Sequence, residues 1–328
     1  VNDKTTDPNG TAAIEINSVA ITEAAAGATV DVKLTPTTGY VTDTVTFNGA
    51  SATKVSDNHY TFVMPAKDVD VVATFVKAQY AVIINASTGG NVSSDKTTAL
   101  QGDSVTLTSN PDVGYEMDKI NVKDASTNAA IAVFTSTDPT PYTITMPAAD
   151  VIVDSTFKAT DFKVTCVTGG NGNVFGPTSG TANYNTTVAL TIKPDAGYEL
   201  DTLEIKGDKT STIYTPAADN SSFTMPAEDV TVKATFKVAN LAVKVNATGG
   251  TVTLDHTDSL YKINDPVSAA LKPDKGMEID TSKIKLEEDN NGTKTDVTSA
   301  AAYALTPSTN PVTFKMGGYP VELTVEFI

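Results

Sequence analysis

Few residues in this sequence have side chains suited to acid–base or nucleophilic chemistry. The two histidines, His59 and His256, carry the side chains that titrate nearest to neutral pH, and they lie far apart in the chain. His59 stands just before a strand-like run, so we expect it in a hairpin turn. A Ser–His–Asp arrangement needs a positioned base, and neither histidine has neighbours that indicate one. The sequence therefore predicts that the protein is not an enzyme.

A single cysteine, Cys166, limits redox and metal chemistry. One cysteine cannot form a disulfide within the chain, and it excludes CxxC redox motifs and sites with several thiol ligands. We interpret Cys166 as a small strand residue in the run 162–167. Together with the isolated histidines, it leads us to predict no catalytic, cofactor-binding or metal-binding residues.

Two segments imitate ligand-binding motifs. Residues 169–176 have a glycine-rich order close to a dinucleotide fingerprint, but the third glycine is displaced and no helical pattern follows. We expect a hairpin there. Residues 287–292 are acidic, but they lack the alternating ligand spacing and the terminal glutamate of an EF-hand loop. A solvent-exposed turn is the favoured interpretation of this second segment.

Three aspartates recur with the same neighbours. Asp68, Asp150 and Asp229 each stand in the string Met-Pro-Ala-x-Asp-Val, which degenerates to Met-Gly-Gly-Tyr-Pro-Val at residues 316–321. Catalytic residues rarely repeat with a scaffold, so we interpret these carboxylates as acceptors for backbone N–H groups in the turn before a closing strand. The methionine is expected in the core. The string indicates an internal repeat of about 80 residues.

Two further landmarks follow the same period. Pro-x-x-Gly-Tyr occurs at residues 36–40, 111–115 and 194–198, and methionine replaces the tyrosine at 273–277. We expect this turn to end one strand and to send its aromatic ring into the core. A Thr-Gly-Gly hairpin signal at 88–90, 168–170 and 248–250 is missing from the first copy. Between the landmarks, apolar residues alternate with Thr or Ser, which is strand periodicity.

The repeat predicts an all-β fold: four tandem small β-domains forming an elongated array, with about five short strands each and essentially no helix. The predicted boundaries are a polar extension at 1–13, a truncated repeat at 14–77, repeats at 78–159 and 160–238, and a divergent repeat at 239–328. From Phe75 to Tyr80, and at the two later junctions, the step is five residues. Such a linker reaches at most about 17 Å, so neighbouring copies must touch. Four domains of roughly 30 Å give a length of about 120 Å.

The motifs together resemble the divergent InlB B-repeat (Listeria–Bacteroides repeat) domains of bacterial surface proteins. The resemblance covers nearly the whole chain after Ile14. Its clearest stretches are residues 60–75, 102–108, 111–116, 194–199 and 223–236. It implies a modular extracellular element of a bacterial surface, a stalk or an adhesion module, with no catalytic residues to transfer.

Charge and hydropathy restrict the partners. The chain has 23 basic residues, all lysine, against 39 acidic ones, and its formal net charge is −16. Nucleic acids and anionic lipids are attracted by clustered cations, so the sequence predicts no nucleic-acid partner. No stretch approaches the roughly 20 apolar residues needed to cross a bilayer, and no membrane insertion is expected.

The leading hypothesis is a non-enzymatic extracellular structural protein, either a rod-like stalk or a subunit of a self-assembling filament. Its expected partners are further copies of itself or neighbouring surface-protein domains. Because the first copy lacks the Thr-Gly-Gly hairpin signal and is about one strand short by sequence, we expect that another chain can add a strand there; the alternative is that a short copy caps the array. The second hypothesis is an adhesin that binds a glycan or a host protein through copy-specific loops, for which residues 123–138 and 287–303 are the candidates.

Two covalent modifications remain open at the level of sequence. Lys–Asn isopeptide bonds would suit a lysine-bearing chain without disulfides, but the sequence identifies no triad of lysine, asparagine and acid. Asn-x-Ser/Thr sites are near their chance frequency and are expected to stay unmodified in a bacterium; they begin at Asn9, Asn85, Asn91, Asn185, Asn220, Asn246 and Asn291.

Overall fold

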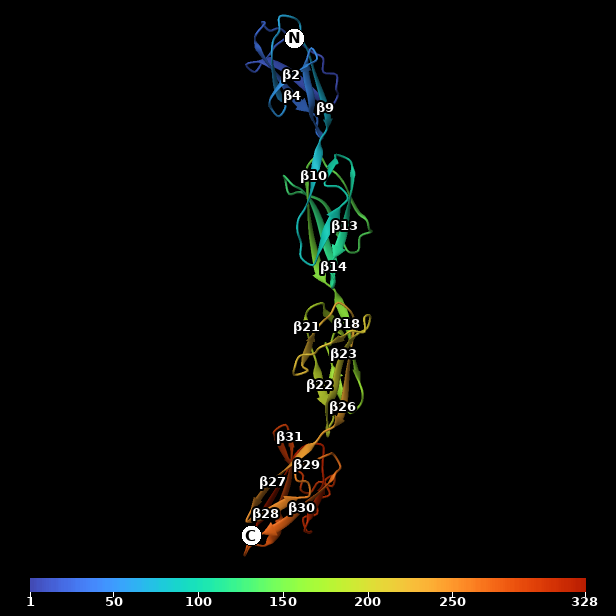
Figure 1. Cartoon of the computed structure of the whole chain (residues 1–328), viewed down its shortest axis with the longest axis vertical. Coiled ribbons are helices and arrows are strands. Elements are labelled where there is room, and N and C mark those ends of the chain that lie inside the picture. Colours follow the sequence, from blue (N-terminus) through green and yellow to red (C-terminus); the bar gives the residue numbers. More distant parts are fainter. The chain divides into compact units, whose positions relative to one another are not determined.

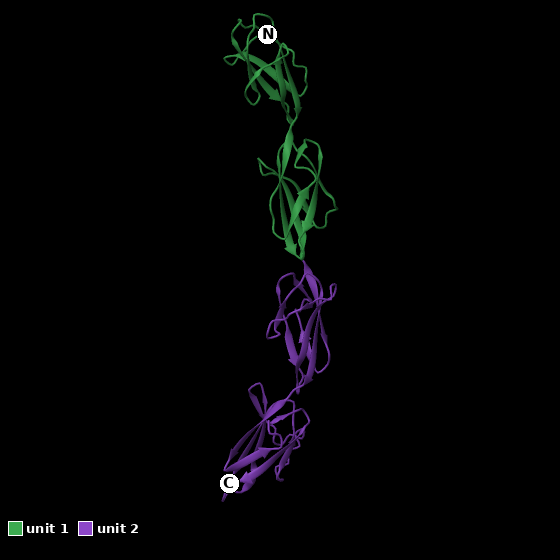
Figure 2. Ribbon diagram, in the orientation of Figure 1, with its two compact units in different colours: residues 1–159 green, residues 160–328 purple.

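The computed structural model describes residues 1–328 and divides them into two compact units, Val1–Ala159 and Thr160–Ile328 (Figure 2). Each unit holds two copies of the repeat. All 34 regular elements are β-strands (Figure 1), which confirms the prediction of tandem all-β domains without helix. No helix that could cross a membrane is present.

The first unit contains copies one and two. Copy one consists of β1 (Asn2–Asp3), β2 (Gly10–Ile16), β3 (Val19–Ala20), β4 (Thr29–Pro36), β5 (Tyr40–Phe47), β6 (Ala50–Ser51), β7 (Thr53–Ser56), β8 (His59–Val63) and β9 (Asp70–Lys77). Copy two consists of β10 (Gln79–Ile84), β11 (Gly90–Ser94), β12 (Thr98–Leu100), β13 (Ser104–Pro111), β14 (Tyr115–Asp124), β15 (Ala130–Thr135), β16 (Tyr142–Thr145) and β17 (Val151–Ala159).

The second unit contains copies three and four. Copy three consists of β18 (Asp161–Thr168), β19 (Gly172–Phe175), β20 (Thr181–Asn183), β21 (Thr187–Ala189), β22 (Thr191–Pro194), β23 (Tyr198–Gly207), β24 (Ile213–Tyr214), β25 (Ser222–Thr224) and β26 (Val230–Val238). Copy four consists of β27 (Leu241–Thr248), β28 (Gly250–Leu254), β29 (Leu260–Tyr261), β30 (Pro266–Pro273), β31 (Ile279–Asn290), β32 (Thr293–Asp296), β33 (Val312–Lys315) and β34 (Val321–Phe327). The expected five strands per copy are too few, because edge strands of two to four residues are too short to show an alternating pattern.

One framework of strands recurs in the copies. In copy two, the closing strand β17 lies at the centre of a five-stranded sheet, parallel to the first strand β10 and antiparallel to β14. A second sheet, ordered β11-β13-β16, contributes apolar residues to the same core. Strands β26 and β34 hold the same central place in copies three and four. Each copy therefore buries its own hydrophobic core.

The recurring methionine fills these cores, as predicted. Met146, Met225 and Met316 are each 1% exposed and Met64 is 7% exposed. The alternation read from the sequence is also confirmed in β13, where Val105 is fully buried and Thr108 is exposed. Burying such side chains on one face of each sheet is the main source of stability in this fold.

The hairpin predicted at Thr-Gly-Gly is wrong, because this turn joins two strands of different sheets: in copy two, β10 pairs with β12 and β17, and β11 pairs with β13. A glycine under the last phenylalanine of each copy explains why the turn recurs. A side chain at Gly90, Gly172 or Gly250 would lie within 2.8 Å of the ring of Phe157, Phe236 or Phe327, respectively, and Gly10 has the same relation to Phe75. Only glycine leaves room for this ring, so the glycine at the start of the second strand and the terminal phenylalanine form one packing unit.

This packing corrects the prediction for the N-terminus. Residues 1–13, expected as a polar extension, contain β1, which pairs in parallel with β9, and the start of β2. Asp7 fastens the turn before Gly10: its carboxylate accepts hydrogen bonds from the backbone N–H groups of Asn9 (3.0 Å) and Phe75 (2.8 Å), which lower its pKa. Copy one therefore has the same turn between its two sheets, with Pro-Asn-Gly in place of Thr-Gly-Gly.

The recurring aspartates bond to a different element from the one expected. The Asp150 carboxylate accepts the backbone N–H of Ala81, and the Asp229 carboxylate accepts that of Lys163, both at 2.7 Å. Those N–H groups belong to the first strand of the copy, not to the turn. Asp68 makes no such bond. The carboxylate thus ties the closing turn to the first strand.

The tyrosine of the Pro-x-x-Gly-Tyr turn packs against the core in copy one, as predicted, but not in copies two and three: Tyr40 belongs to the surroundings of its core, and Tyr115 and Tyr198 do not. Tyr115 is half-buried, and its ring covers Gly89 of the Thr-Gly-Gly turn. A side chain added at Gly89 would lie 2.6 Å from this ring. Met277 covers Gly249 in the same way in copy four. In copy two the ring covers the turn from outside and does not join the core, whereas Met277 also packs against the core of copy four.

Candidate functional site

Copies that follow each other within a unit are joined by the same backbone contact. The carbonyl of Gly39 accepts the N–H of Ala78 at 2.8 Å, and the carbonyl of Gly197 accepts the N–H of Ala239 at 2.9 Å. Both glycines come from the Pro-x-x-Gly-Tyr turn. The turn of one copy therefore holds the linker to the next, and the expected contact between neighbours is present within each unit.

The same glycines pack against the following copy. A side chain at Gly39 would overlap the carboxamide of Gln101, and one at Gly197 would lie 2.8 Å from Ile263. Both glycines have a positive φ, as does Gly276 in the corresponding turn of copy four, which has nothing within 4 Å. The sequence offered one signal of this role, since the glycine recurs at the same position of the turn before each linker.

The copy-specific segment 123–138 forms a hairpin between β14 and β15. The Asp124 carboxylate accepts hydrogen bonds from the hydroxyl and N–H of Ser126 and from the N–H of Thr127, and these bonds hold the pKa of Asp124 at about 2. The segment is thus a fixed turn. Its last residues lead to the pocket described below.

The copy-specific segment 287–303 is more tightly folded. Its acidic part lies in the β31–β32 hairpin, where the Asp289 carboxylate accepts the N–H of Gly292 at 2.7 Å. The predicted turn is confined to Asn291 and Gly292, because residues 287–290 belong to β31. Tyr303 is buried and donates a hydrogen bond to Glu288; burial, and then this bond, raise the pKa of Tyr303. Here a long insertion has become part of the core.

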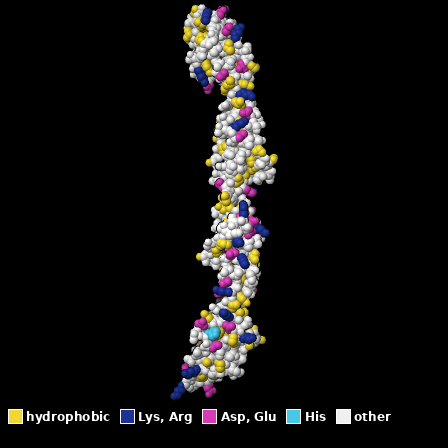
Figure 3. Space-filling model, turned by 45° about the vertical axis from the view of Figure 1, so that its right-hand side comes forward, with side chains coloured by type: hydrophobic (Ala, Val, Ile, Leu, Met, Phe, Trp, Pro, Cys, Tyr) yellow, Lys and Arg dark blue, Asp and Glu magenta, His cyan; other side chains and the backbone are white.

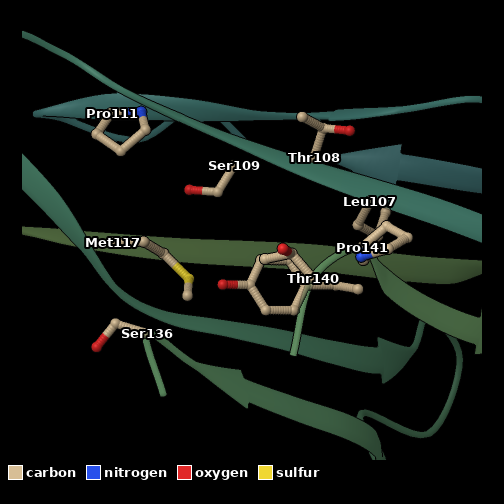
Figure 4. A pocket seen from close by; sticks show the side chains of 9 residues that line it. Leu107, Thr108, Ser109, Pro111, Met117, Ser136, Thr140 and Pro141 are labelled. Carbon is tan, nitrogen blue, oxygen red and sulfur yellow. The ribbon is translucent and has the colours of Figure 1, made fainter. Parts of the chain in front are cut away.

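A pocket of about 490 Å³ opens in copy two (Figure 4). Its lining is uncharged: Leu107, Thr108, Ser109, Pro111, Met117, Ser136, Thr140, Pro141 and Tyr142. In Figure 4, Pro111, Met117 and Ser136 lie toward one end and Leu107 and Pro141 toward the other. Sequence reasoning missed this pocket, although it placed Ser136 in a candidate loop.

The histidines and the cysteine make separate local contacts. A ring nitrogen of His59 lies 2.8 Å from the Asp31 carboxylate. His256 stacks on Tyr261, and its bond to the carbonyl of Leu260 raises the pKa of His256. Burial raises the pKa of the half-buried Cys166 thiol, which keeps it protonated. No three His, Cys, Asp or Glu side chains gather in a group that could hold a metal ion.

A family comparison matches most of the chain. The model for the divergent InlB B-repeat domain matches residues 5–79, 80–161 and 162–240. The chain belongs to this family. Divergent InlB B-repeats are repeats of bacterial surface proteins and not an enzyme family. A search of curated proteins finds no match. The first matched B-repeat starts at residue 5, which agrees with the turn and the start of β2 found before Ile14.

The fourth copy lies almost entirely outside the matched B-repeats, yet it keeps their framework. Its sheet order β29-β27-β34-β31-β32 is that of copy two. It differs where Pro320 replaces the recurring aspartate, because proline offers no carboxylate to the first strand. The copy that lacks this carboxylate also has a large core, which includes Tyr303.

The outer sheet faces of copies two and four carry a cluster that the sequence did not identify. In copy two, the Asp154 carboxylate accepts hydrogen bonds from Asn85 (2.7 Å) and Lys123 (3.1 Å). In copy four, Glu322 accepts hydrogen bonds from Asn246, Lys244 and Lys294. Each cluster brings together a lysine, an acid and an asparagine; Asn85 follows β10, and Asn246 lies in β27.

Proposed function

We propose that this protein is a non-enzymatic, extracellular structural element of a bacterial surface, in which the B-repeats form an elongated stalk. Membership of a family of surface-protein repeats supports the location. The observation that carries the structural role is the repeated junction contact, in which Gly39 and Gly197 each hold the linker and pack against the next copy. A joint that is packed and hydrogen-bonded resists bending, as a spacer requires.

Electron microscopy and small-angle X-ray scattering of the full chain test this role. We expect particles about 120 Å long, with a narrow distribution of bend angles. Replacing both Gly39 and Gly197 by valine breaks the junction packing and should broaden that distribution. Gly276→Val is the matched control, because Gly276 has the same turn and a similar φ but no neighbour. Compact wild-type particles, or equal flexibility of both variants, would refute the stalk.

The surface supports a spacer more than a broad docking face. On the face shown in Figure 3, lysine and acidic side chains are scattered among neutral ones, without a large patch of one charge. The case for strand addition at copy one is lost, because β1 pairs with β9 and β2 pairs with β4, so the strand that looked missing from the sequence is present.

An adhesin is the second candidate function, and the pocket of copy two is the observation that favours it. A glycan array probed with the full chain is the test. Reproducible binding that is lost when the pocket is filled would support an adhesin, and the absence of any bound glycan would count against glycan adhesion.

A further inference from the structure

The pocket of copy two lies where other copies bury an aliphatic side chain. One strand of each copy ends on a proline that pairs with the glycine at the start of the second strand. These corresponding strands are β4, β13, β22 and β30. Two residues before that proline stand Leu34, Ser109, Ile192 and Leu271. Leu34 and Leu271 are buried, and Ile192 packs against its core. Serine in copy two therefore leaves apolar volume unfilled.

The serine also brings an unpaired polar atom into this space. The Ser109 hydroxyl oxygen is buried and has no hydrogen-bond partner. Such an atom costs stability and is uncommon in native proteins. Ser109 is also part of the pocket lining (Figure 4). A ligand that reached this hydroxyl would satisfy it.

The backbone of Ser109 presents a donor and an acceptor on the same side. The hydrogen bond from Met146 N–H to Asp103 O sets the phase of the β13–β16 ladder, so every second residue from Asp103, including Ser109, directs its N–H and C=O toward β16. The ladder ends one such step earlier, at Leu107. Both groups of Ser109 therefore face the pocket without a partner strand.

Copy four shows which chemistry fits this position. There the Asn310 carboxamide donates to the carbonyl of Leu271 at 2.9 Å and accepts its N–H at 3.0 Å. Asn310 precedes the proline just before β33, and Thr140 precedes the proline just before β16. Threonine carries no amide and makes no such bonds. The intact fork in copy four is the complement of what copy two leaves open.

We propose that the pocket of copy two binds a neutral ligand that carries a primary carboxamide on an apolar body. The carboxamide takes the place of the Asn310 side chain and bonds the N–H and C=O of Ser109. The body packs against Met117 and Tyr142, whose sulfur and ring favour an aromatic group. The lining has no charge, and the chain's net charge of −16 disfavours an anion. This ligand class goes beyond the stalk role and does not depend on it.

Benzamide is the first probe, and benzoate is its matched control, because it has the same shape but an anionic group without a donor. We expect saturable shifts of the Ser109 and Thr140 amide resonances of the full chain, with a Kd of about 1–10 mM for so small a ligand. Benzoate should bind at least about tenfold more weakly. Resonances around Ile192, which fills the same place in copy three, should not move.

Two variants test the site from opposite sides. Ser109→Leu fills the pocket as Leu34 and Leu271 do, and Thr140→Asn supplies an internal carboxamide as Asn310 does; each should weaken benzamide binding at least about tenfold. Ser104→Leu, on the exposed face of the same strand, is the control and should bind as wild type. If Ser109→Leu fails to fold, Thr140→Asn still decides, because it copies a residue that this fold already accepts.

A last experiment identifies the kind of molecule that bears the carboxamide. Displacement of benzamide by a short peptide with a central glutamine, and not by the glutamate peptide, supports a side chain of a protein partner; binding of benzamide alone supports a free small molecule. Both results uphold carboxamide recognition. No saturable shift, equal binding of benzoate, or wild-type binding by both pocket variants would overturn the proposal, while the stalk would stand.

Discussion

Copies two and four share a strand framework but close one end of the core differently. In copy four, the buried Leu271 fills this end, and the Asn310 carboxamide bonds the Leu271 backbone. In copy two, Ser109 and Thr140 stand in their places, and a pocket opens. The comparison teaches that the shared framework forms whether or not this end is filled, because the recurring methionine and the first half of the closing strand are buried in both copies. One copy has completed its core there, and the other offers a binding surface.

The largest expected effect tests whether the rest of the two cores is equivalent. Met146→Ala and Met316→Ala should each cost about 2–5 kcal/mol, because both side chains are 1% exposed and their removal leaves a cavity. Hydrogen exchange read separately for each copy measures the loss, since a chain of several domains need not unfold in two states. A cost confined to one of the two variants would contradict a shared core.

A smaller effect is expected where the copies differ. Asn310→Thr installs the copy-two residue in copy four and leaves the backbone groups of Leu271 unpaired, which should cost about 1–3 kcal/mol. Thr140→Asn should instead stabilise copy two by up to about 1 kcal/mol. Denaturant midpoints of each copy give both values. If Asn310→Thr costs nothing, the carboxamide fork is not what closes this end.

Copy three extends the comparison to the variable residue of Met-Pro-Ala-x-Asp-Val. Glu228 accepts hydrogen bonds from the side chains of Thr210 and Tyr214 and from two backbone N–H groups, and these bonds lower its pKa to about 2. An unfolded glutamate has a pKa of about 4.3. The lowered pKa therefore contributes stability that is present above about pH 5 and is lost as the pH falls toward about 2.

Thermal midpoints of copy three between pH 7 and pH 3 measure this contribution. Glu228→Gln should flatten the loss of stability on acidification, and Glu204→Gln, an exposed glutamate of β23, should leave the profile unchanged. Parallel profiles for Glu228→Gln and wild type would show that the turn does not depend on the charge.

The framework could be predicted from the sequence because the framework is what repeats. The methionine, the turn glycines and the closing phenylalanine recur in the same order in the copies. The strands are predicted by the alternation of apolar and polar residues. The turn between the two sheets of copy one was missed because Pro-Asn-Gly does not resemble Thr-Gly-Gly. Gly10 nevertheless lies under Phe75 as Gly90 lies under Phe157. Only the packing of the ring shows that the two are equivalent.

The candidate site was less accessible to sequence reasoning. Ser109 reads as one more polar strand residue unless it is compared with Leu34 and Leu271 in the other copies. Thr140 and Asn310 follow insertions of different length, so their correspondence depends on the strand that comes after them. The exposure of a backbone donor and acceptor depends on where a ladder ends, which no residue pattern specifies.

The smallest effects concern the clusters of lysine, acid and asparagine in copies two and four. An isopeptide bond requires a neutral lysine amine that attacks the asparagine carboxamide, with ammonia as the leaving group, and an acid that holds a proton. The bond from Asn85 and then that from Lys123 lower the pKa of Asp154, and the bond from Lys294 is the main cause that lowers the pKa of Glu322. Both acids are therefore ionised at neutral pH and hold no proton for this reaction, and the bond to Glu322 raises the pKa of the Lys294 amine.

We therefore expect an intact mass equal to that of the sequence, without the loss of one ammonia per bond. Lys123→Met should change the stability of copy two by less than about 1 kcal/mol, because the ion pair is about one-third exposed on both sides. A mass lower by one ammonia that is restored in Asn85→Ala would show that the copy-two cluster forms a covalent bond. The comparison of the copies would then gain a covalent crosslink where we infer only an exchangeable ion pair.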